Sequence, residues 1–468
     1  MLKKDELVEL EIESIGFQGI SIARKESLVY FVKNAVPGDI VKAKVKRKRK
    51  NHIECEIEEL LIQSPHRVKP DCSYFGICGG CSWQHLDYDE QLKWKKQHVA
   101  DAFTRLAKID FGSIEDTLPS PKIFQYRNKM EFSFGNSRWL TKEEISSGKE
   151  IKHKDFALGL HIPGRFDKVL DIDVCHIQND YCNTLLSRIR QKALDLNIEA
   201  YDSRKNAGFL RNLIIRTSVA NNAIMAILIT NIIVSESEKA FINWYDNEFG
   251  KEESRLTVFG RAINDTRSPV ATEKPVILKG EDYITENILG IDFKISPYSF
   301  FQTNSKQLNN FIEEIISRAN LNSENIVWDL YCGTGSITLP ASKKCRQITG
   351  IEFFKSSVED AILNAECNSI ENAKFICADL HDRQIPEVLK TLPKPDVIII
   401  DPPRAGIHAN LAKHLLDIQA DRIVYVSCNP ATQARDCGIL SEKYHVKSIK
   451  PVDMFPHTFH VESIVVLE

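Results

Sequence analysis

The feature that most constrains this chain is a change of pattern near residue 291, after which short apolar segments alternate with helical segments up to the C-terminus. The alternation predicts a parallel, doubly wound sheet, because each strand is followed by a helix that returns the chain to the same edge. In such sheets ligands bind beyond the carboxyl ends of the strands. We therefore expect the functional side chains of residues 291–468 at the strand ends.

The first of these strands, 326–330, contains Asp329 and runs into a turn that holds Gly333 and Gly335. Glycines at this place let the backbone approach a ligand closely. The turn departs from the dinucleotide-binding fingerprint, since Thr338 stands where that fingerprint requires a third small residue.

The next two strands end in acids, Glu352 and Asp379. A carboxylate after the second strand can accept hydrogen bonds from ribose hydroxyls, and the one after the third strand is suited to the adenine end of a ligand. With the glycine-rich turn, this arrangement favours S-adenosylmethionine over NAD as the ligand.

The next two strands narrow the class of reaction. The fourth ends in Asp401-Pro-Pro-Arg404. Methyltransferases that modify amino groups follow a similar motif with an aromatic residue that stacks on the base, so Arg404 argues against that chemistry. The fifth strand ends at Cys428, just before an expected helix, and a helix N-terminus favours a thiolate.

A cysteine beside a methyl donor suits methylation of carbon 5 of a pyrimidine. Addition of the thiolate to carbon 6 turns carbon 5 into a nucleophile that can attack the sulfonium methyl. A base must then remove the carbon-5 proton so that the thiolate can leave. Glu462 lies in an otherwise apolar last strand, where desolvation would raise its pKa toward a useful value. The alternative is a glutamate at a strand edge, facing water.

The first 62 residues alternate apolar and polar side chains, with turns marked by glycine and proline. Such period-2 runs predict a small antiparallel barrel. Within residues 42–50, seven of nine are Lys or Arg. They indicate either a solvated edge strand or, as the local charge excess favours, a strand of an OB-like barrel that contacts phosphates.

Residues 63–290 begin with a cluster of cysteines, continue with a helical stretch over 88–108, and are rich in strands from about 121, with one helical run near 179–196. We expect three domains, at 1–62, 63–290 and 291–468.

Cys72, Cys78 and Cys81 supply three thiolates within ten residues. A closed metal site needs a fourth, which Cys175 or Cys182 could provide. The spacing fits either a tetrahedral zinc ion or a [4Fe–4S] cluster.

The composition excludes several classes of protein. With 61 Lys plus Arg against 64 Asp plus Glu, the net charge is −3, so any site for a polyanion must be a local patch. No stretch reaches the roughly 18 apolar residues of a membrane span, and the N-terminus lacks the apolar core of an export signal. The chain has twelve cysteines, but a disulfide scaffold is expected in a short chain with an export signal, and this chain has neither feature. We expect a soluble cytoplasmic protein.

Several motifs, in order along the chain, resemble those of the RNA uracil-5 methyltransferases of the RumA and TrmA group. The matching segments are Tyr126-Arg-Asn-Lys-Met-Glu-Phe-Ser-Phe-Gly, Gly208-Phe-Leu-Arg-Asn-Leu, Ser299-Phe-Phe-Gln302-Thr-Asn, Asp329-Leu-Tyr-Cys-Gly-Thr-Gly, Asp401-Pro-Pro-Arg-Ala-Gly, Ser427-Cys428-Asn-Pro and His460-Val-Glu462. By this resemblance Cys428 is the nucleophile and Glu462 the base. The residues that we assign to the donor site are Gln302, Asp329, Tyr331, Gly333, Gly335, Glu352, Asp379 and Asp401. RNA cytosine-5 methyltransferases carry a second cysteine where this chain has Asp401-Pro-Pro-Arg404, so uracil is favoured.

The resemblance to the RumA type also implies a TRAM domain at the N-terminus and a [4Fe–4S] cluster with Cys175 as the distant ligand. Both features favour 23S ribosomal RNA as the substrate. Two alternatives are the same chemistry on transfer RNA and an RNA-binding protein with a silent methyltransferase domain. We expect RNA as the partner, neither DNA nor a membrane, and a monomeric protein.

Overall fold

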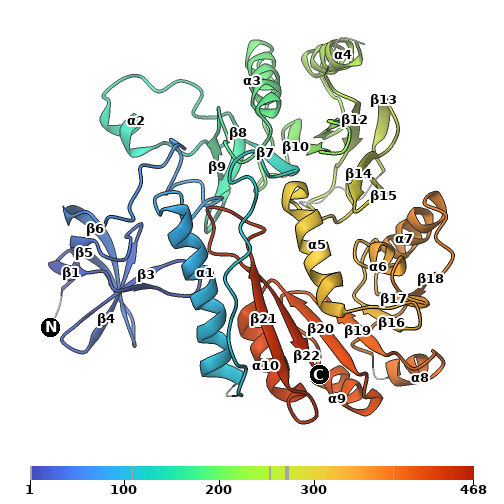
Figure 1. Cartoon of the computed structure of the whole chain (residues 1–468). Coiled ribbons are helices and arrows are strands. Elements are labelled where there is room, and N and C mark those ends of the chain that lie inside the picture. Colours follow the sequence, from blue (N-terminus) through green and yellow to red (C-terminus); the bar gives the residue numbers. More distant parts are fainter. Residues whose placement is uncertain (1–2, 108, 252–254, 269–273, 383) are drawn as a thin grey trace.

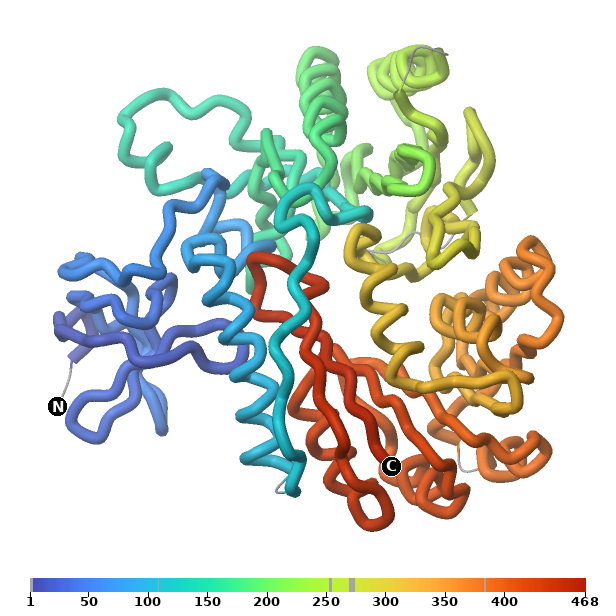
Figure 2. The backbone as a smooth tube through the Cα atoms, viewed as in Figure 1, coloured from blue at the N-terminus to red at the C-terminus, as the bar shows by residue number. Residues whose placement is uncertain are grey.

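The computed structural model describes residues 3–107, 109–251, 255–268, 274–382 and 384–468. Figure 1 shows three regions that follow one another along the chain: a small N-terminal sheet in blue, a central region in green, and a C-terminal sheet in orange and red. The backbone trace in Figure 2 shows the same succession. None of the helices in the described part of the chain has the length and apolar character needed to cross a bilayer.

The N-terminal region is a six-stranded sheet in the order β1-β5-β6-β4-β3-β2. Its strands are β1 (Leu7–Glu11), β2 (Ser14–Ile15), β3 (Ser21–Lys25), β4 (Leu28–Lys33), β5 (Ile40–Lys48) and β6 (Ile53–Ile62). The alternating residues of β5 are buried one by one, as the period-2 pattern predicted. The prediction of antiparallel pairing was wrong for one pair: β4 and β6 run parallel, because β5 crosses over to pair with β1.

The central region is built on a seven-stranded sheet in the order β13-β12-β11-β10-β7-β8-β9. The strands are β7 (Lys129–Gly135), β8 (Ala157–Ile162), β9 (Arg165–Asp171), β10 (Leu210–Thr217), β11 (Ile224–Thr230), β12 (Val258–Ile263) and β13 (Val276–Lys279). The helices are α2 (Lys142–Ser146), α3 (Asp180–Asp195) and α4 (Glu236–Gly250). Helix α3 coincides with the helical run predicted at 179–196, and the side chain of Asn179 caps it.

The C-terminal region contains a seven-stranded sheet in the order β18-β17-β16-β19-β20-β22-β21, preceded by the two-stranded sheet β14-β15. Their strands are β14 (Ile284–Ile288), β15 (Ile291–Ile295), β16 (Ile326–Leu330), β17 (Gln347–Glu352), β18 (Ala373–Cys377), β19 (Val397–Ile400), β20 (Arg422–Ser427), β21 (Val446–Val452) and β22 (Glu462–Leu467). The helices are α5 (Ser305–Ala319), α6 (Thr338–Ser342), α7 (Lys355–Cys367), α8 (Ile385–Lys390), α9 (Ala409–Ile418) and α10 (Pro430–Leu440).

The pairing in this sheet confirms the doubly wound prediction for the five strands from β16 to β20, which are parallel. The last two strands differ, since β22 runs antiparallel to both of its neighbours. Apolar cores cover both faces: Val397 and Ile399 belong to one core and Ile398 and Ile400 to the other. The order reverses between β16 and β19, and a ligand is expected to bind at that switch point.

Helix α1 (Tyr88–Ala102) and the π-helical turn Phe103–Ala107 that follows it replace the single helix predicted at 88–108; residue 108 lies outside the described residues. Val99 and Phe103 are buried in the same core as Tyr425 of β20. A helix from the segment assigned to the central domain therefore packs on the C-terminal sheet. Figure 1 shows α1 beside α10 and β21. The division at 62 and 290 stays a prediction.

Candidate active site

A cavity of about 790 Å³ opens at the carboxyl edge of the C-terminal sheet. The predicted site residues that line it are Gln302, Tyr331, Gly333, Glu352, Asp379, Asp401, Cys428 and Glu462. Most of them follow a strand directly, which is why the ends of parallel strands bring them together.

The glycine-rich turn after β16 forms one wall of this cavity. The backbone N–H of Gly333 donates to Oε2 of Glu352 at 3.1 Å, and that of Phe354 donates to Oε1 at 2.9 Å. Tyr331 has a φ of +66°, which is uncommon for a residue other than glycine and often occurs at functional sites. Its hydroxyl lies 3.2 Å from Nε2 of His381.

Two residues of the predicted donor site, Asp329 and Gly335, do not line the cavity. Asp329 is fully buried and accepts a hydrogen bond from the Thr338 hydroxyl. Burial, reinforced by the nearby carboxylates, raises the pKa of Asp329 to about 7. Gly335 has a φ of +86°, and a Cβ there would lie 3.3 Å from Phe375. Both residues shape the turn from behind its surface.

The antiparallel register of β20 and β22 brings Cys428 and Glu462 together. Ser427 pairs with Ser463, Cys428 follows the first of these residues, and Glu462 precedes the second. The thiol and the carboxyl group therefore lie opposite each other across two neighbouring strands and line the same cavity.

Glu462 is 5% exposed, which excludes the alternative that it faces water. Burial, with the charge of Asp401 as a second cause, raises its pKa to about 8. Burial also raises the pKa of Asp401 to about 6. A carboxyl group with a pKa near the ambient pH can both accept and release a proton.

A helix does begin just after Cys428, as predicted, but the surroundings of the sulfur favour the thiol over the thiolate. Burial, and next the charge of Glu462, raise its pKa to about 11, and Arg404 lowers it only in part. The side chain of the following residue, Asn429, caps α10 by accepting a hydrogen bond from the backbone N–H of Ala431. That N–H group at the start of the helix is therefore already paired. Desolvation and the charges of Glu462 and Asp401 thus oppose the effect that a helix N-terminus has on a thiol.

Arg404 has a second partner in the cavity wall. Its Nη2 donates to Nδ1 of His460 at 3.3 Å. Burial and the Arg404 charge lower the pKa of His460 to about 4, so this ring is neutral and accepts the hydrogen bond. The two side chains therefore form a hydrogen-bonded polar pair in the same cavity wall as Cys428.

Other cavity residues were not predicted from the sequence: Arg127, Phe354, His381 and Phe455. They lie in loops, outside the regular strand ends, and no periodic pattern marks them. The only available signal was proximity to predicted motifs, as Arg127 follows Tyr126 within a matching segment and Phe354 lies two residues after Glu352.

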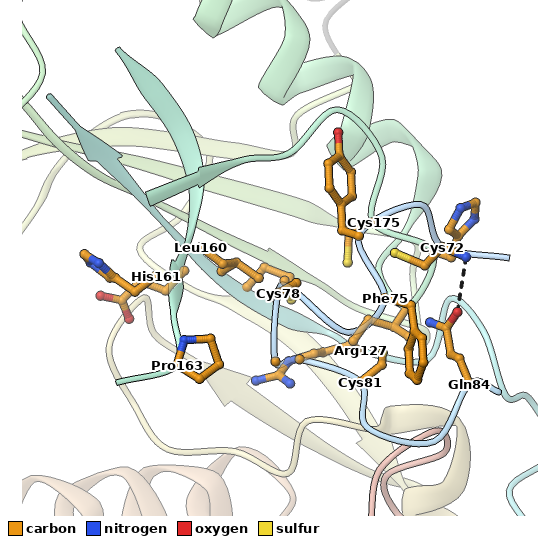
Figure 3. Close-up of a pocket in the computed structure, with 17 residues that line it drawn as sticks. Cys72, Phe75, Cys78, Cys81, Gln84, Arg127, Leu160, His161, Pro163 and Cys175 are labelled. Carbon is orange, nitrogen blue, oxygen red and sulfur yellow. Dashed lines mark hydrogen bonds between the residues drawn. The ribbon is translucent and has the colours of Figure 1, made fainter. Parts of the chain in front are cut away.

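A second cavity, of about 400 Å³, is lined by Cys72, Cys78, Cys81 and Cys175 (Figure 3). Burial raises the pKa of each of these thiols. Cys182 is instead packed in the apolar core of the central region. Within the described ranges, no group of three or more His, Cys, Asp or Glu side chains is arranged to hold one metal ion.

The basic run at 42–50 is opposed by acids in the structure. Three paired lysines on β5 lie opposite glutamates of β6; these paired lysines are Lys42, Lys44 and Lys46, which contact Glu59, Glu58 and Glu56. Arg49 contacts Glu54 at 2.7 Å. The local excess of positive charge is therefore smaller than the run alone indicated, and it rests mainly on Arg47, Lys48 and Lys50.

Comparison with known proteins agrees with this architecture. The family model described as tRNA (Uracil-5-)-methyltransferase matches residues 217–468, and the TRAM domain model matches residues 4–55. An uncharacterized RNA methyltransferase of Bacteroides thetaiotaomicron is 42% identical over 96% of this chain and 99% of its own length. One of Chlorobaculum tepidum is 38% identical over 92% of this chain and 89% of its own length.

Among solved structures, the tRNA (uracil-54, C5)-methyltransferase of Pyrococcus abyssi, crystallised with S-adenosyl-L-homocysteine, has a TM-score of 0.75 and 26% identity. The match covers 98% of this chain and 100% of that one. With a TRAM domain at its N-terminus and a family match over residues 217–468, which include all the lining residues of the C-terminal cavity except Arg127, the chain belongs to the RNA uracil-5 methyltransferase family.

Proposed function

We propose that this protein forms 5-methyluridine in RNA by transfer of a methyl group from S-adenosylmethionine, through a covalent bond between Cys428 and carbon 6 of uracil. The observation that carries the proposal is the register of β20 and β22, which sets Cys428 opposite Glu462 at the wall of one cavity. The sulfur can leave carbon 6 only when a base removes the proton from the neighbouring carbon 5, so the base must lie beside the nucleophile.

The donor would occupy the part of the cavity between the glycine-rich turn and the acids that follow β17 and β18. Glu352 accepts two backbone N–H groups, and each carboxylate oxygen keeps a lone pair for a ribose hydroxyl. The exposed rings of Phe353 and Phe354, at 56% and 63% exposure, lie at the cavity wall and offer flat apolar faces to an adenine.

In the first step the Cys428 thiol gives up its proton to water, the sulfur forms a bond to carbon 6 of uracil, and the electron pair of the double bond between carbons 5 and 6 moves to carbon 5. Carbon 5 attacks the sulfonium methyl, and neutral S-adenosylhomocysteine is released. In the last step Glu462 takes the carbon-5 proton, the electrons of that bond restore the double bond between carbons 5 and 6, and the sulfur leaves as thiolate.

Mutants of the two residues test this sequence of steps. Cys428→Ala should give neither methylated RNA nor a covalent adduct. Glu462→Gln keeps the nucleophile and the donor site, so addition and methyl transfer proceed but elimination stalls. The RNA should then stay bonded to Cys428 as a denaturation-resistant band that carries label from S-adenosyl-[methyl-³H]methionine. Normal turnover by Glu462→Gln would show that another group is the base, and an adduct in Cys428→Ala would refute the nucleophile.

For the second cavity we propose a [4Fe–4S] cluster held by Cys72, Cys78, Cys81 and Cys175. Support comes from the shared wall that these four thiols form. Cys182 does not line that wall and is buried in the adjoining apolar core, against which Cys175 packs. Four thiolates spread around a cavity of about 400 Å³ suit a cluster, in which each cysteine binds a different iron, better than a single ion.

As the substrate we propose 23S ribosomal RNA, which is what the resemblance to the RumA type implies. A second candidate is transfer RNA, because the Pyrococcus abyssi enzyme, named for uridine 54 of tRNA, matches this chain over nearly its whole length. Mapping of 5-methyluridine in both RNA classes, from strains with and without this protein, separates the two. Loss of the modification from tRNA alone would refute the ribosomal assignment.

A further inference from the structure

The loop between β21 and β22, residues 453–461, leads directly into Glu462. Its first residue follows Val452, which pairs with Glu462 across the two strands. The loop also brings Phe455 and His460 to the wall of the catalytic cavity. In Figures 1 and 2 it rises in red from the C-terminal sheet and lies beside the N-terminal end of α1. The loop therefore helps to set the position of Glu462, together with the pairing of β22 with β20 and β21.

Helix α1 holds this loop through a buried ion pair. Nζ of Lys95 donates to Oδ1 of Asp453 at 2.5 Å and to the carbonyl oxygen of Phe455 at 3.0 Å. Both charged side chains are 0% exposed. The hydroxyl of Tyr88 donates to the other oxygen of Asp453 at 2.9 Å. A buried pair of this kind is weak evidence for added stability, and fixing one conformation is the better attested role.

Hydrogen bonds inside the loop carry this attachment toward Glu462. The carbonyl oxygen of Phe455, which Lys95 contacts, also accepts from the hydroxyl of Thr458 at 2.8 Å. The same hydroxyl accepts from the backbone N–H of His460 at 3.2 Å, two residues before Glu462. A continuous series of hydrogen bonds therefore runs from Lys95 through the loop to His460, which in turn contacts Arg404.

A second attachment lies one turn earlier on α1. Oε1 of Gln91 accepts from the backbone N–H of His457 at 2.9 Å, and its amide nitrogen donates to the carbonyl oxygen of Trp83 at 3.1 Å. The N–H groups of Ser82 and Trp83 donate to the carbonyl oxygen of His457, each at 2.9 Å. The segment that follows Cys81 is thus joined to the same loop.

From this geometry we infer that Tyr88, Gln91 and Lys95 form a positioning face on α1 that sets the catalytic carboxyl group of Glu462 against carbon 5 of the bound uracil. The inference rests on the proposed function, in which Glu462 takes the carbon-5 proton while the double bond re-forms and the Cys428 sulfur leaves carbon 6. None of the three residues lines the catalytic cavity, so they act through the loop.

The positioning face matters most in the elimination step. Addition and methyl transfer depend on Cys428 and on the residues proposed to hold the donor, all of which lie outside the loop at 453–461. Proton removal depends on the distance between Glu462 and carbon 5, and a misplacement of about 1 Å can slow such a step about a hundredfold. Loosening the loop should therefore leave methylated RNA bonded to Cys428.

Two variants and their matched controls test the inference. Tyr88→Phe removes a hydroxyl that donates to Asp453 and accepts from the backbone N–H of Ser120. Tyr444→Phe removes a hydroxyl that donates to the Ala420 carbonyl, outside the loop. Lys95→Met removes the buried charge, and Arg318→Met breaks ion pairs with Glu115 and Glu314. Each protein is mixed with substrate RNA and labelled donor, and the methylated adduct is followed by denaturing electrophoresis after rapid quenching.

We expect adduct decay to slow about tenfold in Tyr88→Phe and up to about a hundredfold in Lys95→Met, with methyl transfer within about threefold of wild type. Tyr444→Phe and Arg318→Met should lose thermal stability without accumulating adduct. If Lys95→Met does not fold, Tyr88→Phe decides the question. Adduct decay at the wild-type rate in the folded variants would overturn the inference, provided that Glu462→Gln itself traps the adduct. Failure of Glu462→Gln to do so would refute the proposed function instead.

Discussion

Replacement of Glu462 by glutamine should stabilise the protein by an amount that depends on pH. Burial raises the pKa of Glu462 from its ordinary value of 4.5 to about 8, so folding disfavours the ionised carboxylate. At about 1.4 kcal/mol for each pH unit, the difference corresponds to about 5 kcal/mol of folding free energy. Glutamine has nearly the same shape and does not ionise, so it avoids this penalty.

The sign follows from the direction of the pKa change. Because the pKa of Glu462 is higher in the folded state, its contribution to stability is complete below pH 4.5 and falls as the pH rises, until it is lost above about pH 8. The advantage of Glu462→Gln should therefore be smallest near pH 5 and largest near pH 9. For a domain of this size, about 5 kcal/mol corresponds to a change in Tm on the order of 10 °C.

Calorimetric melting of the wild type and the variant between pH 5 and pH 9 measures this difference. Glu462→Asp is the control, because it keeps a carboxyl group at the same buried position and should keep the decline with pH. A difference between wild type and Glu462→Gln that stays constant over this range would refute the reasoning, since it would show that the carboxyl group does not ionise at a cost to folding.

Three further predictions concern the cysteines, the basic run and the rate. Iron analysis of protein purified without oxygen should find about four irons per chain. Cys175→Ser should lose this iron and Cys182→Ser should keep it. Zinc in place of iron would refute the cluster. Substitution of Arg47 and Lys48 by glutamine should reduce the slope of log Kd for RNA against log salt concentration by up to about 2. Substitution of the paired lysines should change this slope less. A slope equal to that of the wild type in the Arg47 and Lys48 variant would show that the basic run is a solvated strand that does not contact RNA. The rate of elimination should rise as the pH increases through about 8, since only ionised Glu462 accepts a proton; a flat profile from pH 6 to 9 would contradict this role.

The C-terminal site could be predicted largely from the sequence because its residues follow a rule of architecture. Glu352, Asp401 and Cys428 each come at or directly after a parallel strand, and the carboxyl ends of parallel strands meet at one edge. Period-2 and strand–helix patterns mark such strands in a single sequence. The same rule misplaced Asp329, which lies within β16 and is turned into the interior.

What could not be predicted depends on contacts between distant segments. Lys95 and Asp453 are separated by 358 positions, and nothing in either local pattern indicates that they meet. The sequence showed the basic run and the glutamates of β6 as two separate alternating segments. It did not show which lysine faces which glutamate, because bulges between β5 and β6 set their register. The environment of Cys428 is a related case, since the sequence indicated the helix that follows it but not the burial and the two carboxylates that raise the pKa of the thiol.

The raised proton affinities in the cavity are consistent with the order of steps in the proposed reaction. Asp401 and Glu462 both have raised pKa values because they are buried, and a positively charged sulfonium in the same cavity would favour their ionised forms. Linkage requires the reverse as well, so ionised carboxylates favour the cationic donor over its neutral product. In the proposed reaction, methyl transfer removes that positive charge. The proton affinity of Glu462 would therefore rise at the moment when carbon 5 has acquired its methyl group and must lose its proton. The desolvation that raises the pKa of Glu462, at a cost to folding at high pH, is thus the property that the proposed role as base requires.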